Sequence, residues 1–437
     1  MGMARLVRSG SLLLIVGLAP ADAGTLTHGQ QESAAQDDTP QQPEKVQIPE
    51  GFVDVRAGSL DIEPITSEGP LPTAGYDQSP GNGAFLQSAD GEFRLQLGIY
   101  TQIRYNANWR DAPLGNDPGF GNDDVTRGWS LNRTRLFFEG KYTDRYAYHF
   151  RTNTNDSFDT ELLVAWGQLK ISDQWSLRFG KQFIPLSRED WMFPQDLLTI
   201  EFSPNNSTFA IGSSLGAFAN YHGRRHRVWL SFHNGAFGGR DVFPSPETDT
   251  AGTVRWEWNF VGDDWDVWDD QVGRRGRSRV MMLGLSGGYQ GKRVEVTEGA
   301  KQAGQVNLDL SFNGDGYQIV LAGSATWVEP AALDSFTNYG FLVQGGYFLT
   351  PMSQLYAQYN LVDPGDQPGE LVAFNSLAFG YSYFPFAWTN RWKFSAELGH
   401  LFEALNDTVV APSGALGWLP ADEGGQMYLK LQAQFGF

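Results

Sequence analysis

The last ten residues of the sequence, "YLKLQAQFGF" from Tyr428 to Phe437, alternate strictly between apolar and polar side chains. Alternation with a period of two indicates a β-strand whose two faces meet different surroundings. Two interpretations are open: a strand between lipid and water, or the edge strand of a soluble protein. The apolar face holds Leu429, Leu431, Ala433, Phe435 and Phe437, and the polar face holds Lys430, Gln432 and Gln434.

The same rhythm recurs from about residue 86 onward. In "FRLQLGIYTQIRY", Leu97, Ile99 and Ile103 fall on one face, and Gln102 and Arg104 fall on the other. We count sixteen candidate strands, which start near residues 92, 129, 145, 160, 175, 211, 226, 251, 279, 304, 317, 338, 353, 371, 391 and 426. Their connections are alternately short, as in "YTDR", and long, as in "EALNDTVVAPSGALGWLPADEGG"; residues 261–278 are an exception.

Short connections at one end and long ones at the other are typical of an outer-membrane barrel, with periplasmic turns and extracellular loops. Lipid offers no hydrogen bonds to a sheet edge, so the last strand must pair with the first. Sixteen strands also leave room for water inside. The sequence therefore predicts an all-β fold, a transmembrane antiparallel β-barrel of about sixteen strands with a water-filled lumen.

Composition narrows the class of protein. The 437 residues include no cysteine, which excludes disulfides and cysteine metal sites, and the net charge of −18 argues against a nucleic-acid partner. Aromatic residues make up 14% of the chain and glycines number 51, which favours many strands joined by tight turns.

The N-terminal residues predict export. Arg5 and Arg8 precede the apolar run "SLLLIVGLA", and "ADA" ends at Ala23, so we interpret residues 1–23 as a signal peptide. A buried N-terminal helix is the alternative. Residues 24–85 are rich in Gln, Asp, Glu and Pro and are predicted to be disordered, and the barrel is predicted to span residues 86–437.

Basic residues are concentrated on the predicted inner face of the first strands. Rings of arginine or lysine select for anions, because guanidinium groups bind phosphate oxygens in pairs. The alternative is that these charges are ordinary lumen residues paired with Asp and Glu. The candidate anion-selective residues are Arg94, Arg104, Arg133, Arg135, Lys141, Arg145, Arg151 and Arg178.

The connection after the fifth strand, "IPLSREDWMFPQDLLTIEFSPNNSTFA", is rich in large side chains such as Trp191, Met192 and Phe193. A loop that only met solvent would not carry them, so we expect it to fold into the barrel and narrow it. A contact with another subunit or on the outer surface is the alternative. The charged residues expected near this constriction are Arg188, Glu189, Asp190, Asp196 and Glu201.

Three segments carry a family resemblance: "LNRTRLFFEGKYTDRYAYHFRTN", "WSLRFGKQFIPLSRED" and "YGFLVQGGYFLTPMSQLYAQYNLVD". Together they resemble the phosphate-selective porin O and P family over roughly residues 90–437. The resemblance implies a sixteen-stranded, usually trimeric barrel, an arginine-lined pore and an inward third loop with basic residues at the neck. By position, Arg133 and Arg135 resemble the family's strand arginines, whereas Glu201-Phe202 stands where the family often has Glu-Arg, and the neck is more acidic than basic.

Other motifs carry weaker signals. "GLSGG" fits a nucleophile pattern around Ser286, but a strand follows where the motif requires a helix. His222 and His226 lack an acidic partner for a metal site. The stretch Asp263 to Asp270 could bind a cation, but we favour the alternative that it is solvated. No metal and no cofactor are predicted.

We therefore expect a porin of the bacterial outer membrane that is not an enzyme and that lets small anions such as phosphate diffuse passively. Its expected partners are outer-membrane lipid, anionic solutes and two further copies of itself. Phe435 and Phe437 are expected to form the signal by which such barrels are recognised for assembly. The alternatives are adhesion through long loops, or a lipid hydrolase that uses Ser286.

Overall fold

The computed structural model describes residues 72–76, 83–113, 123–154, 159–235, 250–291, 300–330 and 334–437. The predicted signal peptide and most of the segment predicted to be disordered lie outside the described residues.

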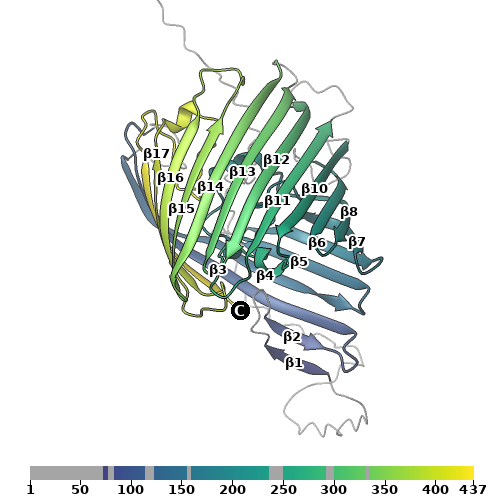
Figure 1. Cartoon of the computed structure of the whole chain (residues 1–437). Coiled ribbons are helices and arrows are strands. Elements are labelled where there is room, and N and C mark those ends of the chain that lie inside the picture. Colours follow the sequence, from purple (N-terminus) through teal and green to yellow (C-terminus); the bar gives the residue numbers. More distant parts are fainter. Residues whose placement is uncertain are drawn as a thin grey trace, which may run out of the picture. The chain divides into compact units, whose positions relative to one another are not determined.

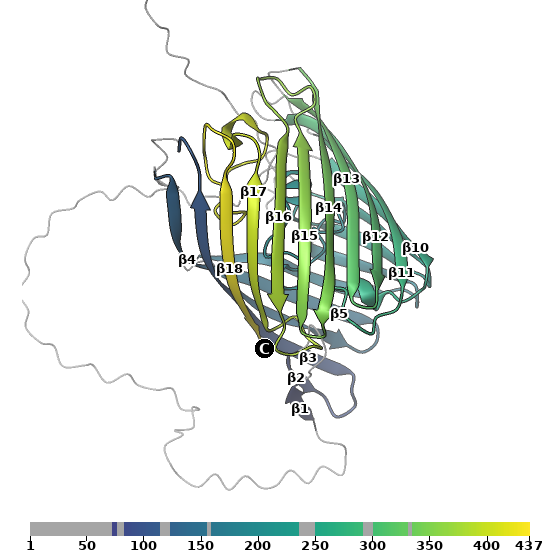
Figure 2. The same ribbon diagram turned by 60° about the vertical axis from the view of Figure 1, so that its left-hand side comes forward.

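Sixteen antiparallel strands form a closed β-barrel. Each strand pairs with its neighbours in the chain, and β18 pairs with β3 from Met427↔Trp109 to Gly436↔Tyr100. Figure 1 shows β10 to β17 side by side in one wall, and Figure 2 shows β18 next to β17. The strands are β3 (Phe93–Trp109), β4 (Val125–Tyr142), β5 (Tyr146–Thr154), β6 (Thr160–Lys170), β7 (Trp175–Phe183), β8 (Ser213–His222), β9 (His226–His233), β10 (Thr250–Val261), β11 (Val280–Gly291), β12 (Ala300–Gly314), β13 (Tyr317–Pro330), β14 (Phe336–Thr350), β15 (Ser353–Asp363), β16 (Phe374–Tyr383), β17 (Lys393–Leu401) and β18 (Met427–Gly436).

All sixteen predicted strands are present, each beginning within a few residues of its expected start, and the predicted fold class is confirmed. The alternation of side chains also has the predicted sense. On β18, Leu431 is 42% exposed on the outer face, whereas Lys430 is 2% exposed and lies inside. The wetted and the apolar face of each strand thus become the inner and outer walls of the barrel.

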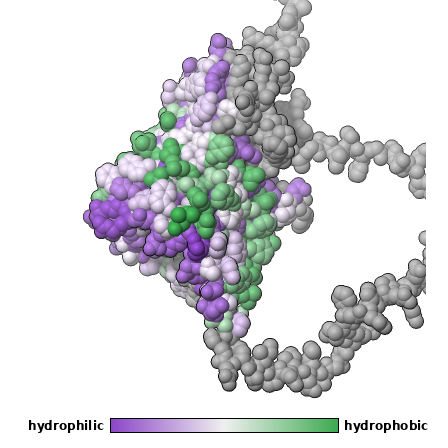
Figure 3. All heavy atoms as spheres, turned by 90° about the vertical axis from the view of Figure 1, so that its right-hand side faces the viewer, coloured by the Kyte–Doolittle hydropathy of each residue, from purple (hydrophilic) through white to green (hydrophobic). Residues whose placement is uncertain are grey.

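The outer wall is rich in exposed apolar side chains, including Leu285, Leu308 and Phe379. One side of the molecule carries a green patch of hydrophobic residues next to purple hydrophilic ones (Figure 3). Such a mixed surface fits a barrel whose middle meets hydrocarbon and whose ends meet water.

Two short strands precede the barrel and differ from the prediction. β1 (Thr73–Tyr76) pairs with β2 (Ala84–Gln87), and β2 pairs with the first part of β3, for example Leu86↔Leu95. The prediction of disorder over residues 24–85 is therefore wrong for these strands. The reason is that β3 begins at Phe93 while its pairing with β18 begins only at Tyr100, so β2 satisfies backbone groups that would otherwise be an open edge.

The connections are unequal at the two ends of the barrel. At the end where β18 finishes most are short, as at residues 143–145, 223–225 and 351–352; residues 262–279 and, to a lesser degree, residues 384–392 are longer. The other end carries two long described connections, which we call the neck loop (residues 184–212) and the 402–426 loop. The connections contain η1 (Pro194–Asp196), α1 (Pro204–Phe209), η2 (Asp266–Trp268) and η3 (Leu405–Asp407). Within the part of the chain that the structure describes, no helix is long and apolar enough to cross a bilayer.

Candidate functional site: the barrel lumen

The neck loop lies inside the barrel and is held to the inner wall by side chains from distant strands. The Ser286 hydroxyl of β11 donates to the Leu186 carbonyl at 2.6 Å, and Lys393 Nζ of β17 donates to the Leu197 carbonyl at 3.0 Å. The Ile200 amide donates to Glu397 Oε2 at 3.2 Å. Since Ile184, Leu186, Leu197, Leu198 and Ile200 are all buried, the apolar composition of this loop serves to pack it into the lumen.

A glycine makes room for the helix of the neck loop. Gly340 of β14 faces α1, and a Cβ at this position would lie 2.3 Å from both Asn205 Nδ2 and Phe209 Cε2. Any larger residue would displace the helix from the wall. The side chain of Ser203 caps α1 by accepting a hydrogen bond from the Asn206 amide at 2.9 Å.

Glu201 neutralises two of the predicted pore arginines. Its carboxylate accepts hydrogen bonds from Arg104 Nη2 at 3.0 Å, and from Arg133 Nη1 and Nη2 at 2.9 and 2.5 Å. Burial opposes the charged carboxylate, but Arg133 and Arg104 outweigh it and hold the pKa of Glu201 well below its ordinary value. The positive charges of Arg104 and Arg133 are therefore largely neutralised by the neck loop.

Two further buried ion groups lie on the wall formed by β10 to β18. Arg255 bridges Glu257 and Asp309, with Nη2 2.9 Å from Glu257 Oε1 and 2.8 Å from Asp309 Oδ2. These groups meet across β11 because Gly284 has no side chain; a Cβ there would lie 2.4 Å from Arg255 Nη2. Beside β18, Lys430 Nζ lies 3.3 Å from Glu397 Oε1.

Three other inward arginines have no carboxylate partner among the described residues. Arg135 Nε contacts Asn153 at 3.3 Å, and Arg178 Nε contacts Gln168 at 2.6 Å and stacks over Trp166. The Arg151 guanidinium lies 3.3 Å from the ring centre of Phe193 in the neck loop. Arg135 Nη1 and Arg151 Nε are buried and have no hydrogen-bond partner in the described structure.

Three predicted pore residues lie elsewhere. Arg145 is exposed in the turn before β5, because β5 begins one residue later, at Tyr146; the prediction that it lines the pore is wrong. Lys141 is 45% exposed at the same end of the barrel and pairs with Asp144 at 2.8 Å. Arg94 stacks over Phe85 of β2, where β3 extends beyond its pairing with β18.

The acidic residues of the neck loop serve different ends. Glu189 accepts hydrogen bonds from the Ser203 amide and hydroxyl at 2.6 and 2.5 Å, and burial raises its pKa to about 7. Burial, with the nearby charge of Asp270, also raises the pKa of Asp196 to about 7. The Asp190 backbone amide donates a hydrogen bond to Ser187 Oγ at 2.9 Å.

Arg188 of the neck loop contacts β10 and the 262–279 loop. Its Nη1 lies 3.8 Å from Glu257 Oε1, and its Nη2 donates to the carbonyl of Trp268 in the 262–279 loop. The predicted constriction residues are therefore brought into the lumen, but they do not form a single ring.

The 402–426 loop fills more of the lumen. Its buried residues pack with Phe209 of α1 and with inward residues of the nearby strands, in a cluster of Phe209, Val362, Phe374, Leu401, Leu405, Val409, Val410, Leu416, Trp418 and Tyr428. The 402–426 loop thus occupies the side of the lumen along β15 to β18. The neck loop crosses the lumen, with contacts to β4 through Glu201, to β11 through Leu186 and to β17 through Leu197.

An open chamber of about 680 Å³ remains on the other side. Its lining comes from β6 to β9, from Arg188 and Trp191 of the neck loop and from Asp269 of the 262–279 loop. Arg178 and Arg227 also face this space. Residues 172–174, a short turn, lie on its rim, so the chamber reaches the end of the barrel at which β18 finishes.

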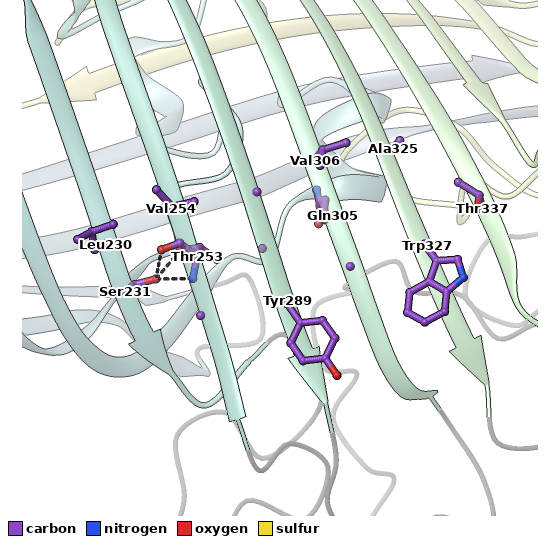
Figure 4. A pocket seen from close by; sticks show the side chains of 14 residues that line it. Leu230, Ser231, Thr253, Val254, Tyr289, Gln305, Val306, Ala325, Trp327 and Thr337 are labelled. Atoms are coloured by element: carbon purple, nitrogen blue, oxygen red, sulfur yellow. Dashed lines mark hydrogen bonds between the residues drawn. The ribbon is translucent and has the colours of Figure 1, made fainter.

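A second depression, of about 710 Å³, lies on the outer wall (Figure 4). Its floor includes Gly252, Gly287 and Gly304, and the exposed side chains of Tyr289 and Trp327 flank it. It faces outward and contributes nothing to the lumen.

The sites of weaker motifs are also placed. Ser286 lies in the middle of β11, points inward and bonds the neck loop, so it does not stand at a strand-to-helix elbow or on the lipid face. The interpretation of Asp263 to Asp270 as solvated holds only in part: Asp263, Asp266 and Asp269 are exposed, whereas Asp270 and the apolar residues Trp265, Val267 and Trp268 are buried. No cluster of three or more His, Asp or Glu side chains suited to a metal is found among the described residues.

The prediction missed the acidic partners on the strands. Glu257, Asp309 and Glu397 all occupy inward positions of alternating strands, for example in "KFSAELGHL". The same alternation that places the basic residues on the inner face also places these carboxylates there.

A lumen lined with charges, narrowed by an inward loop and enclosed by an apolar outer wall defines a porin-type barrel. Residues 107–264 match the family described as phosphate-selective porin O and P. The family match and the fold place the protein in the bacterial outer membrane as a channel. No curated protein sequence matches the chain.

Solved structures show the same architecture. The anion-selective porin from Comamonas acidovorans aligns with a TM-score of 0.54 and 10% identity, over 79% of this chain and 100% of that one. The trimer form of OmpT, an outer membrane protein of Vibrio cholerae, aligns at 0.51 and 13% identity, over 78% and 99%. Salmonella typhi OmpF in complex with daunomycin aligns at 0.52 and 9% identity, over 79% and 98%. At these identities the likeness shows the fold.

Proposed function

We propose that this channel conducts small anions, including phosphate, by passive diffusion. The observation that carries the proposal is the set of inward arginines without a carboxylate partner, Arg135, Arg151 and Arg178. They lie on β4, β5 and β7. Arg178 lines the open chamber, and Arg151 lies against Phe193 of the neck loop, which lines the same chamber. An anion meets successive guanidinium groups there, each of which binds weakly enough to release it.

The pairing pattern supports anions over cations. Along the wall from β10 to β18 the acidic groups Glu257, Asp309 and Glu397 are held by Arg255 and Lys430. Glu201 is held by Arg104 and Arg133. These four carboxylates are thus paired with basic side chains, whereas the guanidinium groups of Arg135, Arg151 and Arg178 have no carboxylate partner in the part of the chain that the structure describes.

The experiment is a reversal-potential measurement in planar bilayers across a KCl gradient. We expect the wild type to favour chloride and the Arg135→Gln/Arg151→Gln/Arg178→Gln variant to lose most of that preference. Arg145→Gln, which removes one guanidinium charge from an exposed turn, is the control and should behave as wild type. If the triple variant keeps the wild-type preference, this assignment of the selective residues is wrong.

We further propose that the protein is a homotrimer embedded in outer-membrane lipid and that it has no enzymatic activity. The support is the family match, the trimer form of a structural neighbour and the broad apolar outer wall. The mass of the detergent-extracted protein, measured by light scattering, tests this: a monomer would contradict the trimer.

A further inference from the structure

The 262–279 loop is the longest described connection at its end of the barrel. It joins β10 to β11, whereas other strand pairs are linked by turns such as residues 143–145 and 351–352 or by the shorter connection of residues 384–392. Instead of extending outward, it is packed inward, with Trp265, Val267, Trp268, Asp270, Gln271 and Val272 all buried.

The first part of this loop is fixed to the neighbouring wall. Trp265 Nε1 donates to the Gly223 carbonyl at 3.1 Å, and Trp268 Nε1 donates to Asn259 Oδ1 at 2.9 Å. Arg277 closes the loop on itself through two contacts with Asp270, at 2.9 and 2.6 Å. A paired and buried carboxylate of this kind holds the loop in one shape.

The second part of the loop contacts β14 and the connection after β16. Gln271 accepts a hydrogen bond from Gln344 of β14 at 3.0 Å. Val272 is fully buried with Phe348 and Phe384, and Arg274 Nη1 donates to the Ala387 carbonyl at 2.6 Å. The loop therefore extends inside the barrel from β10 and β11 to β14 and to the connection after β16.

The 262–279 loop contacts the neck loop directly. The Gln271 amide donates to the Asp196 carbonyl at 2.8 Å. Arg188 of the neck loop donates to the Trp268 carbonyl and lies over the Trp268 ring at 5.4 Å. Two loops that enter the barrel from its opposite ends are thus in contact within the lumen.

We propose that the 262–279 loop is the second half of the channel constriction, entering from the periplasmic end, and that it limits the size of the solutes that pass. By closing the side of the lumen along β11 to β16, it confines solutes to the chamber beside β6 to β9. Trp268 and Gln271 act as positioning residues, since they fix the neck loop through Arg188 and Asp196. This inference rests on the proposed channel function and adds its size limit.

The direct test replaces residues 264–277 with a short glycine-rich turn and measures single-channel conductance. We expect conductance to rise severalfold and larger uncharged solutes to enter liposomes that exclude them with the wild type. Asp263→Asn, which alters only an exposed pair with Arg224 at 3.3 Å, is the control and should leave both unchanged. A folded replacement variant with wild-type conductance and size limit would overturn the proposal.

Cysteine labelling gives a second test that needs no deletion, because the chain has no native cysteine. A membrane-impermeant maleimide added from the periplasmic side should label Asp263→Cys quickly and Val272→Cys slowly. Equal labelling would show that the loop does not pack inside and would overturn the proposal. If the wild type failed to conduct while Val272→Cys stayed protected, the channel function would fall but the inward position of the loop would stand.

Discussion

The Arg133 guanidinium donates two hydrogen bonds to the Glu201 carboxylate, from Nη1 to Oε2 at 2.9 Å and from Nη2 to Oε1 at 2.5 Å. Arg133 belongs to the barrel wall and Glu201 to the neck loop, so this pair ties the constriction to the wall. It also shows that an arginine on the inner face is not by itself a site for a permeating anion. Selectivity depends on which guanidinium groups are left without a carboxylate.

Replacing Glu201 should therefore strengthen the preference for anions. In Glu201→Gln, Arg104 and Arg133 lose their shared counter-charge, so the reversal potential across a KCl gradient should move further toward the chloride equilibrium potential. Breaking a buried pair on one side typically costs about 3–5 kcal/mol, so the variant should also unfold at a lower urea concentration. Glu370→Gln removes an exposed carboxylate and is the control; an equal shift in both variants would contradict this role of Glu201.

The anion preference should depend on pH through Asp196. Burial and then Asp270 raise its pKa to about 7, while Arg151, Lys393 and Arg274 face it with positive charge. The carboxyl is neutral below this pH and negative above it, so anion preference should fall as the pH rises through 7.

Asp196→Asn tests the origin of this pH dependence. In the wild type the reversal potential should change most around pH 7, the raised pKa of Asp196. In the variant the reversal potential should change less between pH 6 and 8. The stability linkage has the same direction: a carboxyl with a raised pKa favours the folded state at low pH, and this contribution is lost as the pH rises from the unfolded to the folded pKa. An unchanged profile in Asp196→Asn would assign the pH dependence to another group.

Gly340 should tolerate no side chain. Gly340→Val would bring a Cβ within 2.3 Å of Asn205 and Phe209, so α1 must move, and we expect a loss of about 1–3 kcal/mol in the free energy of unfolding. Limited proteolysis should also cut the neck loop faster. In Gly323→Val, the added Cβ meets only the Gly340 carbonyl oxygen, at 4.0 Å, so this control should stay close to wild type.

A charged substitution on the outer wall should cost more free energy of folding near the middle of the bilayer than near its surface. Leu285 lies in the middle of β11 and is half exposed, so Leu285→Arg should cost about 2–4 kcal/mol in lipid vesicles. Leu349 is similarly exposed but lies next to the end of β14, and Leu349→Arg should cost about 0–1 kcal/mol. Urea unfolding followed by tryptophan fluorescence measures both. Equal costs would contradict the membrane position of this wall.

The strands and their faces could be predicted because a period of two is a local property of the sequence. Phe193 and its neighbours in the neck loop could also be assigned to the interior from their size alone. The partners could not be predicted: Arg255 meets Asp309 across Gly284, and nothing local to any of these residues specifies that contact. The acidic stretch around Trp268 divides in a way that its charge does not indicate, since Asp266 and Asp269 are exposed while Asp270 is buried and paired with Arg277.

The end of a strand was the least predictable feature. Arg145 has the right phase for the lumen, but the chain is still in a turn at this position, so its side chain is exposed. Whether a residue one position before a strand faces inward depends on where hydrogen bonding begins, and alternation does not report this.

The most direct test of the central claim is the current through single wild-type molecules in a planar bilayer under a KCl gradient. The account predicts steady, ohmic openings that reverse at a potential displaced toward the chloride equilibrium potential. Openings that reverse toward the potassium potential, or a folded, inserted protein that shows no openings, would contradict it.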